Sequence, residues 1–324
     1  MSEAKDLGNF ELPAIIEQAA ASVPETWRQK AALTVFKIIA GSAGPGVAKA
    51  RDSWAMMNAR ERVTSALAEE VAKRAVADPQ IMDRAMSHMI AEEFKSQENR
   101  ESVSRIALED LSEPAPNEDQ AGEGNDPLDE DWITKFSRYA EQVSNIDMQR
   151  MWARVLAGEV RKPGSYSFRT LRFLSDMDQR TGEVFQDLAR HNLANNALFL
   201  LPEQYNSGPN HRKITTLLDA GLIVERPGTT NRPAGISKDG DVSIYYGVDL
   251  ALLIKPAVSI NIPIVQLSTV GRELLRLIPP ANDFEILKDL AEYIRKRASK
   301  VSSAVIAKQV SEGDIIKFIP ISSI

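Results

Sequence analysis

The chain of 324 residues contains no cysteine, few aromatic residues and only three histidines. Without cysteine it cannot form a disulfide scaffold, a thiolate metal site or a cysteine nucleophile. Aromatic residues make up 6% of the chain, so its hydrophobic content of 43% must pack mainly through leucine, isoleucine, valine and alanine. His88, His191 and His211 stand in neither a HExxH nor a HxH pattern, which argues against a histidine metal site.

The sequence also has little that could carry it into or across a membrane. Its start, MSEAKDLGNFELPAII, has no basic stretch followed by an apolar one, so we expect no secretion. The longest weakly apolar window, 31–50, contains two lysines, a proline and three glycines, and cannot supply an apolar span of about 20 residues. We therefore expect a soluble bacterial protein of the cytoplasm. Surface association of 31–50 with a bilayer is an alternative to test.

Acidic charge is concentrated in one segment of the chain. The formal net charge is -6, but residues 109–131 hold ten carboxylates and no lysine or arginine, so the remainder sums to about +4. A nearly balanced remainder does not predict a strong binder of polyanions. Residues 111–130 are rich in proline, glycine and acids and poor in apolar residues, which predicts an acidic disordered linker.

Hydrophobic periodicity divides the rest of the chain into three parts. Residues 1–110 read as an amphipathic helical region, whose segments 61–75 and 80–96 need a partner surface. Short links between the helices within 131–196 predict a tryptophan-centred helical bundle. Within 197–324, LLDAGLI, a hairpin and LSTVGRELL follow the order of a winged helix. The expected fold is mainly α with a C-terminal α+β part, a helical bundle followed by a winged-helix-like module.

The most specific motif lies between 131 and 171. It reads WARVLAGEV at 152–160 and KPGS at 162–165, followed by Ser167 and RTL at 169–171. This pattern resembles the bacterial domain-of-unknown-function 2806 family over about 95–195. The bundle also resembles the abortive-infection alpha proteins, which share a tryptophan-centred helix, and that resemblance implies a role in defence against phage. Neither resemblance implies catalytic residues, and the helical spacing of Trp152 and Leu156 is typical of a core.

Two groups of basic residues are candidate contacts. The first surrounds the KPGS turn, where a phosphate or an acidic partner could dock, although complementing a helix C-terminus explains these residues more simply. The second lies in the expected helix and wing of the C-terminal module, where neighbouring acids balance it, so we favour protein docking slightly over DNA binding. The first group is Arg161, Lys162, Arg169 and Arg172, and the second is Arg212, Lys213, Arg232 and Lys238.

The sequence shows no catalytic motif that we recognise. Residues 41–46 have the glycine spacing of a phosphate loop, but Val47 occupies the position where such a loop requires lysine. We expect no enzymatic activity, no cofactor and no metal, and we identify no small-molecule ligand. The sequence predicts a non-enzymatic interaction protein, an antiphage defence or stress effector that works through self-assembly or partner binding. The alternatives are a winged-helix DNA-binding regulator and a membrane-associating effector.

Overall fold

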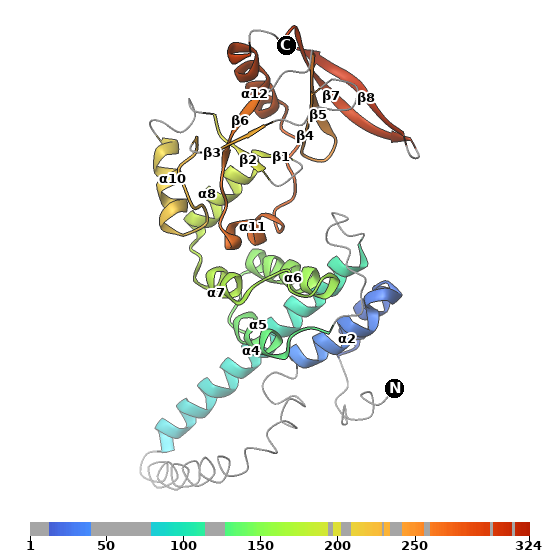
Figure 1. Ribbon diagram of the computed structural model, residues 1–324. Helices are drawn as coiled ribbons and strands as arrows, with labels where there is room; N and C mark the ends of the chain where they lie inside the picture. Colours follow the sequence, from blue (N-terminus) through green and yellow to red (C-terminus); the bar gives the residue numbers. More distant parts are fainter. Residues whose placement is uncertain are drawn as a thin grey trace. The chain divides into compact units, whose positions relative to one another are not determined.

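The computed structural model describes residues 13–39, 79–113, 127–193, 197–201, 209–228, 230–233, 242–255, 260–298, 301–312 and 315–324. The chain forms two compact units, Met1–Leu171 and Arg172–Ile324 (Figure 1). The described part of the first is helical and that of the second mixes helices with a sheet, which confirms a mainly α fold with a C-terminal α+β part.

Among the described residues, five helices lie wholly within the first unit. Asp129 caps the start of α5 (Glu130–Ala140), because its side chain accepts hydrogen bonds from the backbone N–H groups of Asp131 and Trp132. Asn145 caps the start of α6 (Ile146–Arg161) in the same way. A further helix, α7 (Phe168–Asp176), crosses the division between the units. The five helices are α1 (Ala14–Ser22), α2 (Glu25–Ile39), α4 (Pro79–Ser112), α5 (Glu130–Ala140) and α6 (Ile146–Arg161).

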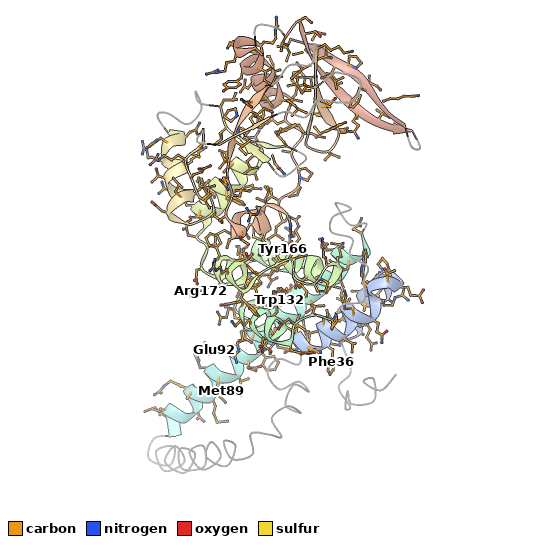
Figure 2. The ribbon with its side chains drawn as sticks, in the orientation of Figure 1. Phe36, Met89, Glu92, Trp132, Tyr166 and Arg172 are labelled. Atoms are coloured by element: carbon orange, nitrogen blue, oxygen red, sulfur yellow. The ribbon has the colours of Figure 1, made fainter. Side chains whose placement is uncertain are left out.

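The two halves of α4 have different surroundings. The C-terminal half contacts α1, α2, α5 and α6, and it buries Val103, Ala107 and Leu108 among them. The N-terminal half is exposed, and Figure 2 shows Met89 and Glu92 on the part of α4 that projects away from Trp132.

The helix α4 also corrects the start expected for the acidic linker. It continues to Ser112 and buries Leu111, because Leu111 lies on the same face as the other packed residues. Residues 114–126 of that expected linker lie outside the described residues.

The second unit contains an antiparallel sheet with the strand order β3-β6-β2-β1-β4-β5-β7-β8. β4 and β5 pair along their length and join at Gly247, whose φ of 63° favours glycine. The predicted strand segment within 242–255 is thus a hairpin by itself. The strands are β1 (Asn192–Leu193), β2 (Ala197–Phe199), β3 (Thr230–Pro233), β4 (Val242–Tyr246), β5 (Leu250–Lys255), β6 (Asn261–Val265), β7 (Ser303–Glu312) and β8 (Ile315–Ser323). The helices are α8 (Gln179–Ala189), α10 (Pro209–Asp219), α11 (Thr269–Leu275) and α12 (Phe284–Arg297).

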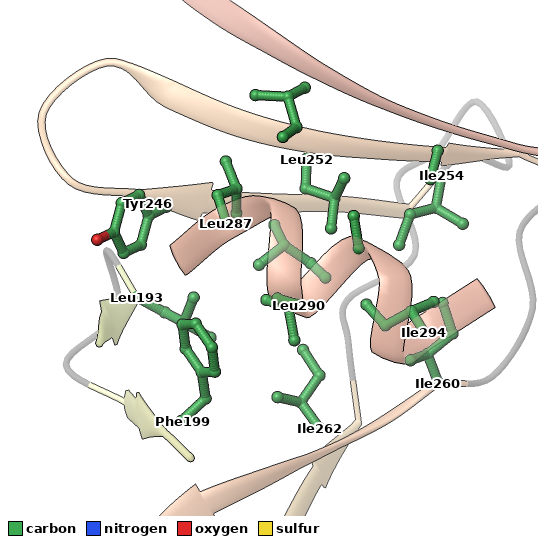
Figure 3. Packing of buried hydrophobic residues seen from close by; sticks show 14 of the residues in the cluster. Leu193, Phe199, Tyr246, Leu252, Ile254, Ile260, Ile262, Leu287, Leu290 and Ile294 are labelled. Carbon is green, nitrogen blue, oxygen red and sulfur yellow. The ribbon is translucent and has the colours of Figure 1, made fainter. Parts of the chain in front are cut away.

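The core of the second unit lies between α12 and the sheet. Leu287, Leu290 and Ile294 recur at helical spacing on α12, and all three are buried. Figure 3 shows them facing residues of the sheet, among them Tyr246 and Leu252. None of the helices in the described ranges combines the length and the apolar character needed to cross a membrane.

Candidate functional site

The motif at 152–171 fixes the end of α6 and the turn that follows it. The buried carboxylate of Glu159 accepts hydrogen bonds from the backbone N–H groups of Gly164 at 2.6 Å and of Tyr166 at 3.0 Å. Gly164 has a φ of 82°, a conformation that favours glycine. Gly158 leaves space for Tyr166, because a Cβ atom at 158 would lie 2.7 Å from Cε2 of that ring. These contacts give Gly158, Glu159 and Gly164 of the motif a structural role.

The tryptophans of this region are core residues. Trp152 is fully buried and packs edge-on against Phe136, with ring centroids 5.5 Å apart. Trp132 stacks on the same Phe136 at 5.1 Å and donates its indole N–H to the backbone oxygen of Tyr166 at 2.7 Å. The aromatic cluster thus holds α5, α6 and the turn together.

The structure separates the four basic residues around the turn. Arg161 is buried, and its guanidinium donates to the Asp110 carboxylate at 2.7 Å and to the backbone oxygen of Asp110 at 2.5 Å. It joins α6 to the end of α4, so it is not exposed to a partner as the sequence suggested. Lys162 and Arg169 are exposed in the first unit. Arg172, in the second unit, is also exposed, and its Nε atom lies 3.8 Å from the Asp176 carboxylate.

The second basic group is also divided. Arg212 is exposed on α10, whereas Lys213 is half-buried, with its Nζ atom 2.6 Å from the Asp187 carboxylate. For Arg232 only the backbone, within β3, is described, and Lys238 lies outside the described residues.

Lys213 lines a cavity of about 360 Å³ that sequence reasoning missed. The walls come from α8, α10, the start of α12 and the residues just after α8, which are far apart in the chain. No local pattern could have brought them together. The lining residues are Val184, Asp187, Leu188, Arg190, His191, Leu200, Asn210, Lys213, Ile214, Leu217, Asp283, Glu285, Ile286 and Asp289.

Charged groups of this cavity form a chain of ion pairs. The Arg190 guanidinium forms an ion pair with Asp283 and lies 3.8 Å from the Asp187 carboxylate. Asp187 in turn forms an ion pair with Lys213. Burial alone raises the pKa of Asp283, but hydrogen bonds from the Ile286 N–H and from Arg190 outweigh it and lower that pKa below its usual value. Burial lowers the pKa of His191, which favours the neutral imidazole.

Burial also shifts the pKa of a tyrosine hydroxyl close to Arg190. The Tyr246 hydroxyl donates to the backbone oxygen of Arg190 at 2.7 Å, and burial raises the pKa of Tyr246 to about 12. In the part of the chain that the structure describes, no group of three histidine or acidic residues is arranged to hold a metal ion.

The N-terminal half of α4 presents a group of large apolar side chains on the surface of the first unit. At 100° per residue, Ile81 to Phe94 spread over about 220° of the helix circumference. Met89 and Ile90 lie five turns before the buried residues Ala107 and Leu108, so the exposed face continues the packed one. We call this surface the α4 face; its residues are Ile81, Met86, Met89, Ile90 and Phe94, which are between 48% and 70% exposed.

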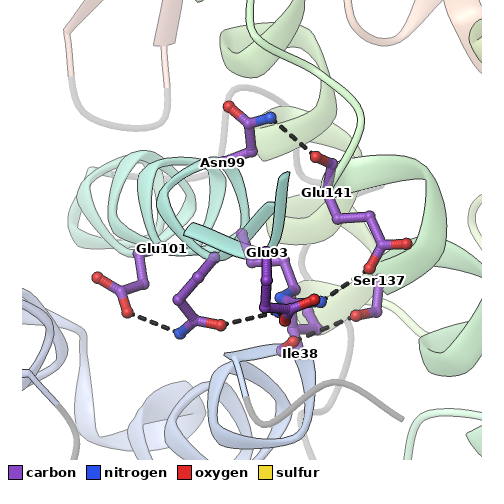
Figure 4. A network of polar contacts seen from close by, with 8 residues as sticks. Ile38, Glu93, Asn99, Glu101, Ser137 and Glu141 are labelled. Carbon is purple, nitrogen blue, oxygen red and sulfur yellow. Dashed lines mark hydrogen bonds and ion pairs between the residues drawn. The ribbon is translucent and has the colours of Figure 1, made fainter. Parts of the chain in front are cut away.

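A polar network marks the point at which the α4 face meets the packed half. Arg100 is buried, and its guanidinium donates to Glu141 at 2.8 Å, to Gln97 at 2.9 Å and to Glu93 at 3.1 Å. Asn99 donates to the backbone oxygen of Glu141 at 2.8 Å, as Figure 4 shows. The bonds of Asn99 and Arg100 attach α4 to the end of α5. The turns of α4 before Glu93 take no part in this network.

Comparison with known proteins supplies one match. Residues 83–207 match the model of the family described as "Protein of unknown function (DUF2806)", which confirms the family resemblance seen in the sequence. None of the curated proteins and none of the solved structures matches the chain. The matched range begins within the α4 face, includes the tryptophan helix and its turn, and ends just before α10. Residues 83–207 are thus similar to this family, and the match brings no function with it.

Proposed function

We propose that this protein is a non-enzymatic interaction protein that self-assembles through the α4 face. The observation that carries the proposal is the exposure of Met86, Met89, Ile90 and Phe94 on one helix. Removing apolar surface from water stabilises a complex by roughly 25 cal/mol per Å², and contiguous apolar patches on a surface mark interaction sites.

A second copy of the chain is the occupant that we propose for the α4 face. The same face on two copies is matched in chemistry, as an isologous contact requires. Residues 80–98 extend the helix by about 28 Å, which is long enough for several layers of paired side chains. With the resemblance to abortive-infection alpha proteins, this surface supports a role in antiphage defence or stress that works through assembly.

Light scattering coupled to size exclusion tests the proposal on the full chain. We expect the wild type to form a dimer or a larger oligomer, and Met89→Glu to shift it to a monomer because the charge would be buried in the contact. Ala91→Glu is the matched control, since Ala91 is exposed on the opposite side of the same helix.

Two outcomes would overturn self-assembly. One is a wild type that stays monomeric over a wide range of concentrations. The other is an oligomer that Met89→Glu and Ala91→Glu affect equally. A monomer that Met89→Glu destabilises and Ala91→Glu does not would mean that the chain covers the face itself, for example with residues 61–75.

The strand order supports a DNA-binding regulator as a second candidate. In the second unit β6 lies between β2 and β3 in the sheet, and α10 lies between β2 and β3 in the chain, as in a winged helix. Arg212 is exposed on α10, but Lys213 is bound to Asp187, so α10 offers little free positive charge. A gel shift at about 50 mM salt, where phosphate contacts are strongest, decides it: no binding to any duplex would remove this candidate.

A further inference from the structure

We propose that the cavity between α8, α10 and α12 binds a small neutral molecule, an alcohol or phenol that carries an apolar body. The inference is independent of the α4 face, because the residues that line the cavity all belong to the second unit. It assigns a small-molecule site that neither the family match nor the sequence motifs indicate.

The size and the walls of the cavity fit such a ligand. Its volume of about 360 Å³ falls in the range of small-molecule sites, roughly 300 to 1,000 Å³. Its apolar lining includes Leu188, Leu200, Ile214 and Leu217, all of which are buried. An aromatic or aliphatic body that contacts these side chains leaves water for an apolar surface, which favours binding.

The charged side chains from α8, α10 and the residues beside them are paired with one another. The Arg190 guanidinium forms an ion pair with Asp283, and the Lys213 Nζ atom lies 2.6 Å from the Asp187 carboxylate. A charged ligand would replace one partner of such a pair by another, and an exchange at a half-exposed pair gains little. The ligand would still lose part of the hydration of its own charge.

The acids of α12 that line the cavity are also compensated. The Glu285 carboxylate lies 3.5 Å from the Lys288 Nζ atom, and Asp289 also has an interaction partner. Neither acid therefore offers an unpaired charge to a ligand cation. Because the charges of both signs in the lining already have partners, the cavity favours an uncharged ligand over a cation or an anion.

His191 gives the ligand a polar group to bind. Its ring packs edge-on against Phe199, with centroids 5.5 Å apart, which fixes the orientation of the imidazole. The Nδ1 atom is buried, so Nε2 is the nitrogen of this half-buried side chain that a ligand in the cavity can reach.

A hydroxyl group is the partner that matches this imidazole. Burial outweighs the opposing effect of Asp187 and lowers the pKa of His191, so the neutral ring is favoured. Each nitrogen of a neutral imidazole either donates or accepts a hydrogen bond, according to the tautomer. A hydroxyl can do both, so a ligand hydroxyl can pair with His191 in either tautomer without bringing a charge into the cavity.

Ligand-observed NMR titration of the full chain with three matched compounds tests the proposal. The compounds are 2-phenylethanol, phenethylamine and phenylacetate, which share the aromatic body and differ in charge. We expect 2-phenylethanol to bind tightest and each ion to bind weaker by about fivefold or more. No binding of 2-phenylethanol, or binding of either ion as tight as that of the alcohol, would overturn the proposal.

A pair of histidine variants tests the hydrogen bond to the ligand. His191→Phe keeps a ring against Phe199 and removes the nitrogens, so 2-phenylethanol should bind about fivefold weaker. Ethylbenzene has no hydroxyl and should bind the wild type and His191→Phe equally. His211→Phe is the control, because His211 is exposed on α10 and lies outside the cavity lining. Equal effects of the two variants on 2-phenylethanol would overturn the choice of an alcohol.

A second pair of variants, on α8, places the binding in this cavity. Val184 is half-buried in the lining, so Val184→Trp should fill part of the cavity and weaken 2-phenylethanol by about tenfold. Gln186→Trp is the control, because Gln186 is exposed on the same helix and lies outside the lining. Equal binding to the two tryptophan variants would rule out the cavity as the site. If Val184→Trp shows no cooperative thermal unfolding, the histidine pair decides alone.

Discussion

The two compact units use their charged side chains in different ways. In the first, the arginines that join helices are buried, with side chains 8% exposed at Arg100 and 3% at Arg161. In the second, the cations around the cavity are half-exposed, at 51% for Arg190 and 41% for Lys213. The difference teaches that a buried cation is committed to the fold, whereas a half-exposed one can exchange water and partners at little cost.

The largest expected effect comes from the buried arginine of the first unit. Arg161→Met should lower the free energy of unfolding by about 3 kcal/mol, because it leaves Asp110 and two backbone oxygens without their donor. Urea unfolding followed by tryptophan fluorescence measures this unit, since all four tryptophans lie before Leu171. Arg169→Met, at an exposed arginine, is the control and should change little. Equal losses in the two variants would show that burial does not set the contribution of Arg161.

A smaller effect is expected for the corresponding change in the second unit. Arg190→Met should cost about 1 kcal/mol or less, because its ion pairs are partly open to solvent. Hydrogen exchange of α12 amides measures the stability of this unit separately from the other. A loss as large as that of Arg161→Met would show that exposure does not decide the contribution of these pairs.

The smallest expected effect is a change with pH in the free energy of unfolding of the second unit. The pKa of His191 is lowered from 6.5 in the folded state, so below pH 6.5 the unfolded chain takes up a proton that the folded chain does not. Stability should therefore fall as the pH drops below 6.5, until folded His191 itself becomes protonated. His191→Phe should flatten this part of the curve, and His211→Phe, at an exposed histidine, should not. If the free energy of unfolding of His191→Phe changes with pH as it does in the wild type, the burial of His191 does not contribute to the pH dependence.

Much of the fold could be predicted because local patterns encode it. The stripe of Leu287, Leu290 and Ile294 predicts α12, and the alternation of apolar residues in 242–255 predicts strand structure there. The helices of 131–171 follow from the periodicity of their apolar residues and from the proline–glycine turn. These features depend on residues that are close in sequence, so one sequence is enough to find them.

Other features depend on contacts that one sequence does not display. Arg161 looked like a surface residue because its partner, Asp110, lies on a helix far earlier in the chain. Lys213 looked like a contact for DNA because Asp187, on a different helix, was not visible as its partner. The apolar residues of 80–96 were recognised as needing a partner, but only the structure shows that they stay exposed while the same face is packed further along α4.

Exposure of Met86 and Met89 makes the α4 face chemically vulnerable. The chain has no cysteine, so no thiol competes for oxidants, and accessible thioether sulfurs are among its most readily oxidised groups. Conversion to the sulfoxide would give each side chain a strong dipole and remove its apolar character. Mild peroxide would therefore act as a reagent against assembly, and methionine sulfoxide reductase would restore it.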